Sequence, residues 1–264
     1  PSTWHETGIE FFGTFGKGYA TFDYQALIVT GLNANGFDRN NWVAGGKQGF
    51  FEVDNFTSPA YVARLDYRGV PGLRIGGSFY YCVNTASNSD KVATYAGVKA
   101  PLRIYTVDGQ YKNKYVTART NFVFGNLTGA TAISNKNKGL SNSSPYTRVV
   151  QVAKKAVSYA GEVGVNLRSI CNGNKKVPVI YPFARYEYYN PQEAGEKGQL
   201  PMDKRNQVSM WTAGLNWYAL PNLVVKADYM TRQIGTGKVF GKGKYNSENE
   251  FSIGIAYVGW FIKK

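Results

Sequence analysis

The 264-residue chain has only two cysteines, Cys82 and Cys171, and a single histidine, His5. Two widely separated cysteines form no disulfide framework and have no metal-ligand spacing. A centre that needs several histidines is excluded by count, and no nucleophile motif stands beside His5. We therefore predict no catalytic residue, no metal site, no cofactor and no enzymatic activity.

The sequence also lacks any run of about 18 apolar residues, the length of a membrane-spanning helix. Mean hydropathy is −0.34, and 18% of the residues are charged. A polar average does not exclude a membrane, because a barrel strand is apolar only at every second residue. No signal peptide is present and the first residue is Pro1, so we expect a processed chain or part of a longer one.

Aromatic residues, glycine and positive charge are abundant. There are 20 Tyr, 15 Phe, 5 Trp and 30 Gly, and 31 Lys plus Arg against 17 Asp plus Glu give a net charge of +14. Such a balance attracts anions, nucleic acid or anionic lipid. The basic residues are spread over several connecting segments rather than one patch, which disfavours nucleic acid. External lysines could instead bind lipopolysaccharide phosphates or a protein partner.

Apolar and polar residues alternate along the whole chain, which is typical of strands with one apolar face. Most such segments have ten to fourteen residues, longer than the roughly 5–6 of globular strands and enough for the ~9–11 that cross a membrane. We predict eleven strands, over residues 5–13, 19–31, 59–68, 72–82, 101–112, 115–124, 156–169, 177–189, 208–218, 222–232 and 249–261.

The connections between these segments alternate strictly between short and long. "GVPG", "KNK" and "ALPN" are short, whereas "VNTASNSDKVATYAGVKA" and "NPQEAGEKGQLPMDKRNQ" are long. Outer-membrane barrels have this asymmetry, with short periplasmic turns and long external loops. A soluble sandwich has no reason to keep it. The sequence therefore predicts an all-β, antiparallel transmembrane β-barrel.

One face of each predicted strand is apolar and the other is polar. In "NEFSIGIAYVGWFIKK", Phe251, Ile253 and Ile255 share one face, opposite Ser252 and Gly254. Aromatics near the strand ends would form girdles at the two membrane interfaces. The predicted girdle residues are Trp211, Trp217, Tyr229, Tyr257, Trp260 and Phe261. The charged face needs water and would line a wet lumen.

Six segments carry a resemblance to a known family: "PSTWHETGIEFFG", "YQALIVTGLNANGF", "ARLDYRGVPGLRIGGSFY", "PFARYEYYN", "LPNLVVKADYM" and "NEFSIGIAYVGWF". In order and spacing they resemble the C-terminal part of the phosphate-selective-porin-like family, in its bacteroidete-type branch. The resemblance implies a barrel of sixteen or eighteen strands in the outer membrane of a Gram-negative cell. It also implies a homotrimer that passes anions or small solutes, with ladders of Arg and Lys along the pore.

The chain departs from such ladders because its predicted pore carries both signs. The predicted pore-lining residues are Arg64, Arg68, Arg74, Arg119, Arg168, Arg185, Lys226, Arg232, Asp66, Asp108, Glu162, Glu187 and Asp228, beside Glu10, Asp23, Lys112 and Glu250. Arginine suits anions because its planar guanidinium group donates several hydrogen bonds. Each of these arginines could equally pair with a neighbouring carboxylate of the pore wall. We predict a porin for passive diffusion of small solutes with a weak anion preference. The alternative is a barrel subunit, or scaffold, of a larger outer-membrane complex with an occluded lumen.

The odd number of predicted strands leads to a last expectation, that these strands form only part of a barrel. Residues 1–264 would be the C-terminal portion of one barrel domain, since eleven strands that begin inward leave an odd number to be supplied. With sixteen in total, five strands would precede Pro1, in the same protein or in a separate chain. The constriction would then lie in a loop that ends near Trp4. The expected partners are outer-membrane lipid and lipopolysaccharide, the N-terminal remainder of the barrel and two further copies of the chain.

Overall fold

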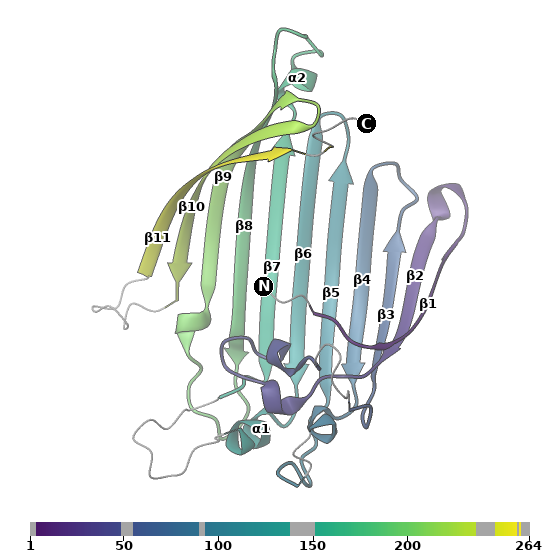
Figure 1. Ribbon diagram of the computed structural model, residues 1–264, viewed down its shortest axis with the longest axis vertical. Coiled ribbons are helices and arrows are strands. Elements are labelled where there is room, and N and C mark those ends of the chain that lie inside the picture. The colour runs from purple at the N-terminus through teal and green to yellow at the C-terminus, as the bar shows by residue number, and fades with distance from the viewer. Residues whose placement is uncertain are drawn as a thin grey trace.

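The computed structural model describes residues 4–48, 55–89, 93–137, 151–235, 246–257 and 259. These residues form a single eleven-stranded sheet in which every strand pairs antiparallel with its neighbours in sequence order (Figure 1). The strands are β1 (Gly8–Phe15), β2 (Phe22–Val29), β3 (Ala60–Tyr67), β4 (Leu73–Cys82), β5 (Leu102–Lys112), β6 (Val116–Leu127), β7 (Lys155–Val165), β8 (Val179–Ala194), β9 (Val208–Leu220), β10 (Leu223–Ile234) and β11 (Asn246–Tyr257).

All eleven predicted strands are confirmed, and only their ends differ. The largest differences are at the C-terminal ends of β7 and β8. The strand expected over 156–169 ends at Val165, because Asn166 caps the short helix α2 (Leu167–Ile170) by accepting a hydrogen bond from the Ser169 amide. The next strand runs on to Ala194 rather than ending at 189.

The two ends of the sheet differ as the connection lengths predict. At one end, hereafter the turn end, the strands are joined by tight turns, the 3₁₀ turn η1 (Gly18–Ala20) and α2. At the opposite end, the loop end, lie η2 (Ala34–Gly36), η3 (Ala44–Gly46), η4 (Thr85–Asn88), α1 (Ala130–Lys136) and η5 (Lys204–Asn206). In the turn "GVPG", Gly72 has φ +80°, a left-handed conformation that favours glycine.

The sheet is bent into a trough, and its two faces have opposite character. Ile253 and Ile255 on the convex face are 70% and 73% exposed, and among the described residues no second sheet or helix layer covers that face. The main hydrophobic core lies instead at the loop end, where Leu32, Phe37 and Leu127 are fully buried. No helix within the described ranges is long and apolar enough to cross a membrane.

The odd number of strands has a direct geometric consequence. Because neighbours alternate in direction, β1 and β11 run the same way, and neither has a partner on its outer edge within the described sheet. A direct β1–β11 junction would be the one parallel pair in an otherwise antiparallel sheet. The sheet is open between these two edges.

Candidate functional site: a charged belt on the concave face

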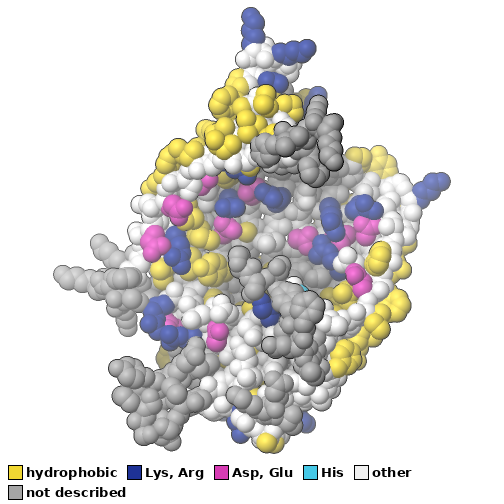
Figure 2. All heavy atoms as spheres, viewed as in Figure 1, with side chains coloured by type: hydrophobic (Ala, Val, Ile, Leu, Met, Phe, Trp, Pro, Cys, Tyr) yellow, Lys and Arg dark blue, Asp and Glu magenta, His cyan; other side chains and the backbone are white. Residues whose placement is uncertain are grey.

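Charged side chains of both signs cross the middle of the concave face (Figure 2). Residues that lie opposite each other in neighbouring strands point to the same face, and the strand register aligns these charged residues with one another or with other concave-face positions. The ion-paired members define the charged belt: Asp23, Arg64, Asp66, Arg68, Arg74, Asp108, Arg119, Glu162, Arg185, Glu187, Arg232 and Glu248.

Arg64 of β3 is the centre of the first cluster in the belt. Its Nε and Nη2 donate to both oxygens of Asp66, at 2.7 and 2.6 Å. Its Nη1 and Nη2 donate to Asp108 of β5, at 2.7 and 3.0 Å. Arg74 adds a 2.9 Å bond to Asp66, whose side chain is only 2% exposed. Two bidentate pairs on one guanidinium fix the plane of the Arg64 side chain.

Gly76 of β4 makes this arrangement possible. It stands between Asp66 and Asp108 in the register, so the strand that separates the two carboxylates carries no side chain there. A Cβ on Gly76 would overlap Asp66 Oδ1 and Arg64 Nη2 and lie 3.0 Å from Arg64 Cζ. The glycine therefore leaves the space that the Arg64 guanidinium occupies on its way to Asp108.

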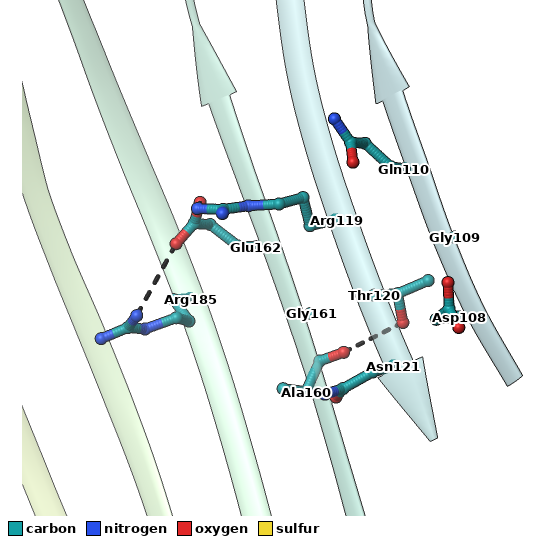
Figure 3. A pocket seen from close by; sticks show the side chains of 10 residues that line it. All are labelled: Asp108, Gly109, Gln110, Arg119, Thr120, Asn121, Ala160, Gly161, Glu162 and Arg185. Atoms are coloured by element: carbon teal, nitrogen blue, oxygen red, sulfur yellow. Dashed lines mark hydrogen bonds and ion pairs between the residues drawn. The ribbon is translucent and has the colours of Figure 1, made fainter. Parts of the chain in front are cut away.

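The second cluster spans β6, β7 and β8 and borders a shallow pocket of about 340 Å³ (Figure 3). Arg119, Glu162 and Arg185 are aligned in one row across the three strands. Glu162 lies 2.5 Å from Arg119 Nη2 and 3.8 Å from Arg185 Nη1, and Arg185 Nε lies 3.1 Å from Glu187. Alternating signs across neighbouring strands are the favourable arrangement for cross-strand pairs.

Two smaller pairs extend the belt to both sides. Arg68 binds Asp23 at 2.5 Å, and Asp23 also accepts a hydrogen bond from Thr14. Arg232 of β10 binds Glu248 of β11 at 2.9 Å.

The predicted lining residues Lys226 and Asp228 occupy the same face of β10. Neither takes part in an ion pair within the part of the chain that the structure describes.

The signs in the belt balance. Six arginines meet six carboxylates, so the paired groups contribute no net charge. Opposite charges at such short distances give a field that falls off quickly into water. The belt is therefore a polar, hydrated surface rather than an uninterrupted cationic ladder.

The placement of Arg168 on a strand of the polar face is wrong. Arg168 lies in α2 at the turn end, and its Nε donates to the Val177 carbonyl at 2.6 Å. The strand ends three residues earlier because Asn166 begins the helical turn.

The converse error concerns Glu248. The sequence-based strand begins at 249, so this carboxylate was left outside it, whereas β11 begins at Asn246 and places Glu248 on the concave face. The signal was its even spacing from Glu250.

Residues 31–48, hereafter the strap, form a second feature of this face. The strap leaves β2, folds inward through η2 and η3 and crosses the concave side near the loop end (Figure 1). The Trp42 ring lies on Gly125 of β6, a concave-face position, and Trp42 Nε1 donates to the Ala153 carbonyl at 2.9 Å. Phe37 and Val43 are each 1% exposed. The strap is thus held by a packed apolar interior, not only by polar contacts.

Polar contacts fasten the strap to distant loops. Asn206 Nδ2 donates to the Arg39 carbonyl at 3.1 Å, and Asn137 Nδ2 donates to the Ala34 and Phe37 carbonyls at 3.0 and 3.1 Å. Arg39 also lies 3.9 Å from Asp203. The strap therefore spans the trough from β2 to the segment that precedes β9.

Asp203 is the titratable group at this fastening. Its Oδ1 accepts from the Arg205 amide, and its carboxylate forms an ion pair with the Arg205 guanidinium. Hydrogen bonding from the Arg205 side chain, together with the nearby charge of Arg39, lowers the pKa of Asp203 below its ordinary value. The carboxylate is thus ionised throughout the neutral and mildly acidic range.

The convex face carries four of the six predicted girdle residues. Trp211 and Tyr229 lie in its loop-end half, and Trp217 and Tyr257 lie near the turn end. Trp211 is 61% exposed and packs against Tyr186, with ring centroids 4.6 Å apart and the ring planes tilted by 47°. Trp260 and Phe261 lie outside the described residues.

Fold and site together define a class: an antiparallel β-barrel sheet with an apolar outer face and a polar, ion-paired inner face. No family model and no curated protein matches the chain. Among solved structures, a Pseudomonas aeruginosa FadL homologue matches over 95% of this chain and 67% of its own, with 11% identity and a TM-score of 0.36. The resemblance to the phosphate-selective-porin-like family stays a prediction.

Proposed function

We propose that the chain is part of the wall of an outer-membrane channel for passive diffusion of small solutes, with a weak anion preference. The observation that carries the proposal is the contrast between the two faces of one sheet. An uncovered apolar face of this extent needs lipid, whereas ion-paired arginines and carboxylates need water. A barrel wall between lipid and an aqueous lumen meets both requirements.

The spacing of aromatics on the convex face supports a membrane. Four strands each carry two outward aromatics six residues apart, one toward the loop end and one toward the turn end: Tyr61 and Tyr67, Tyr105 and Tyr111, Trp211 and Trp217, and Phe251 and Tyr257. Six residues of strand span about 20 Å. On strands tilted by roughly 35–45° this is about 15 Å along the membrane normal, so the two aromatics of each pair lie toward the two edges of an apolar band of about 25 Å.

A complete barrel requires partners for the edges of β1 and β11. Closure with antiparallel pairs alone takes an odd number of further strands between them, since β1 and β11 run in the same direction. We propose that an additional segment of the same protein supplies those strands. Assembly into a homotrimer remains a prediction.

The weak anion preference follows from where the positive charge lies. The paired belt is neutral, so the excess that gives the chain +14 lies outside it. Lys226 is an exposed cation on the concave face, and other lysines lie in the turns and loops at the channel mouths. Rings of charge at a channel wall bias selectivity without absolute exclusion.

The strap favours a second candidate, an occluded barrel subunit of a larger envelope complex. It packs on the concave face with buried Phe37 and Val43 and with Trp42 on Gly125, so it narrows the loop end. In this case the purified protein would be electrically silent and would co-purify with other subunits.

Planar-bilayer recording of the full-length protein tests both candidates. The channel proposal expects stepwise conductance and, in a salt gradient, a small reversal potential of anion sign. Arg185→Gln should reduce the anion bias, because it removes a cation from the channel wall. Lys155→Gln is the control with the same charge change, since Lys155 faces outward, away from the lumen, and it should leave the bias nearly unchanged. A silent wild-type protein, or one that selects cations, contradicts the proposal.

A further inference from the structure

The outward face of the sheet carries two charged residues among all the strand positions that the register assigns to it. These are Arg103 at the start of β5 and Lys155 at the start of β7. Every other charged residue that the register places on a described strand points to the concave face; Glu193, in the irregular last part of the β8 pairing, accepts a 2.9 Å hydrogen bond from the outward-facing Asn190. Two cations on an otherwise apolar surface therefore call for an explanation.

The two cations are neighbours in space. Arg103 pairs with Asn126 of β6, and Asn126 pairs with Lys155, so the three residues form one row across adjacent strands. Two strand spacings place the Arg103 and Lys155 Cα atoms about 10 Å apart. Both side chains are long enough for their charged ends to meet a common anion between them.

The row lies at the level of a lipid headgroup. Arg103 comes one outward position before Tyr105, the loop-end aromatic of β5, and its guanidinium lies 5.4 Å from the ring of Tyr81. Tyr81 and, through it, Tyr61 are in register with Arg103, so the row lies level with loop-end aromatics, which mark the membrane interface. Long basic side chains at such a level extend toward the polar layer.

The concave arginines differ from these two cations in their partners. The six belt arginines are each paired with a carboxylate, whereas neither Arg103 nor Lys155 has a carboxylate within 4 Å in the described part of the chain. Between them, the Asn126 Oδ1 atom is buried and accepts no hydrogen bond from any residue that the structure describes. The row is thus a cationic site that lacks its counter-charge.

We propose that Arg103 and Lys155, with Asn126 between them, bind the phosphomonoester headgroup of an outer-leaflet lipid whose acyl chains lie along the apolar wall below. The guanidinium supplies a planar pair of donors for phosphate oxygens, and the ammonium supplies a second point charge. The inference rests on the proposed function, because it requires the convex face to be in a membrane with its loop end outside.

Binding of diphosphoryl lipid A to the full-length protein in detergent, measured by native mass spectrometry, tests the site. The double variant Arg103→Gln/Lys155→Gln should bind it roughly 30-fold more weakly, about fivefold for each cation lost near the surface. Lys175→Gln/Lys176→Gln is the matched control, since it removes the same charge from the exposed turn at the opposite end. This control should bind as the wild type does.

Three results would overturn the inference. Equal losses in both double variants would mean diffuse attraction by net charge. No loss in the Arg103→Gln/Lys155→Gln variant would remove the site. Displacement of lipid A by millimolar inorganic phosphate would assign the row to free phosphate instead of a lipid.

The same preparations are recorded in planar bilayers to separate this inference from the channel proposal. Unchanged lipid binding in a conducting double variant refutes only the lipid site. A wild-type protein that neither inserts nor conducts refutes the channel proposal.

Discussion

The substitution Gly76→Ala tests whether the belt is built around the empty position in β4. The added methyl group would overlap Asp66 Oδ1 and Arg64 Nη2. These two atoms are hydrogen-bonded to each other at 2.6 Å, so neither can move without stretching an ion pair. The neighbouring Gly77→Ala is the matched control, because its Cβ would point to the convex face and meet only the Thr106 carbonyl oxygen, at 3.7 Å.

The magnitude follows from the groups that are displaced. A hydrogen bond to a charged group contributes about 1.5–3 kcal/mol, and alanine in a strand gains roughly 0.5–1 kcal/mol over glycine. Asp66 is nearly buried and the Arg64 side chain is 20% exposed, which keeps solvent screening modest. We expect Gly76→Ala to lower the free energy of unfolding by about 1–2 kcal/mol. Gly77→Ala should leave it unchanged or raise it by up to about 1 kcal/mol.

The measurement is the thermal loss of β-sheet circular dichroism for the full-length protein in detergent. At roughly 2–4 °C per kcal/mol, Gly76→Ala should melt several degrees below the wild type. Single-channel traces should also become noisier, because Arg64 no longer has one fixed orientation. Equal melting temperatures for the two alanine variants would refute the argument that Arg64 depends on Gly76.

Three further predictions concern the strap and the belt. Trp42→Ala should remove about 3–5 kcal/mol of packing that holds the strap, and should thereby raise single-channel conductance. The control Trp217→Ala removes an outward-facing ring and should leave the conductance unchanged. Equal conductance in the two variants would contradict the position of the strap in the lumen. The lowered pKa of Asp203 contributes stability above the ordinary aspartate pKa of about 3.9, and this stability is lost as pH falls through the lower folded value. Conductance should therefore rise below about pH 4, and Asp203→Asn should show the raised level already at neutral pH. Glu162→Gln should increase anion selectivity, measured as a reversal potential, because it leaves Arg119 and Arg185 without their shared carboxylate. Arg119→Gln should shift the reversal potential in the opposite direction. A shift of the same sign in both variants would exclude the belt from the conduction path.

The strand pattern was readable because alternation is a local property. Side chains on a strand change face at every residue, so Phe251, Ile253 and Ile255 had to share a face wherever the strand paired. Turn residues such as Gly72 marked the tight connections by their own backbone preference. Strand ends were less accurate, because side-chain caps such as Asn166 decide where pairing stops.

Pairing between side chains required the register, which no single segment contains. Arg64 and Asp108 are 44 residues apart and meet only because Gly76 stands between their strands. In the same way, Arg103 and Lys155 become neighbours only through β6. A shift of one residue in any of these pairings would turn the partners to opposite faces.

The sequence by itself determined the all-β class, the eleven strands, the polarity of the two faces and the contrast between short turns and long connections. The tertiary structure alone decided which charges neutralise one another and that residues 31–48 fold inward onto Gly125. It also showed that every strand pairs only with its neighbours in the sequence, which leaves the outer edges of β1 and β11 without a partner in the described sheet. Local alternation sets the first group, whereas strand register and loop packing depend on residues far apart in the chain.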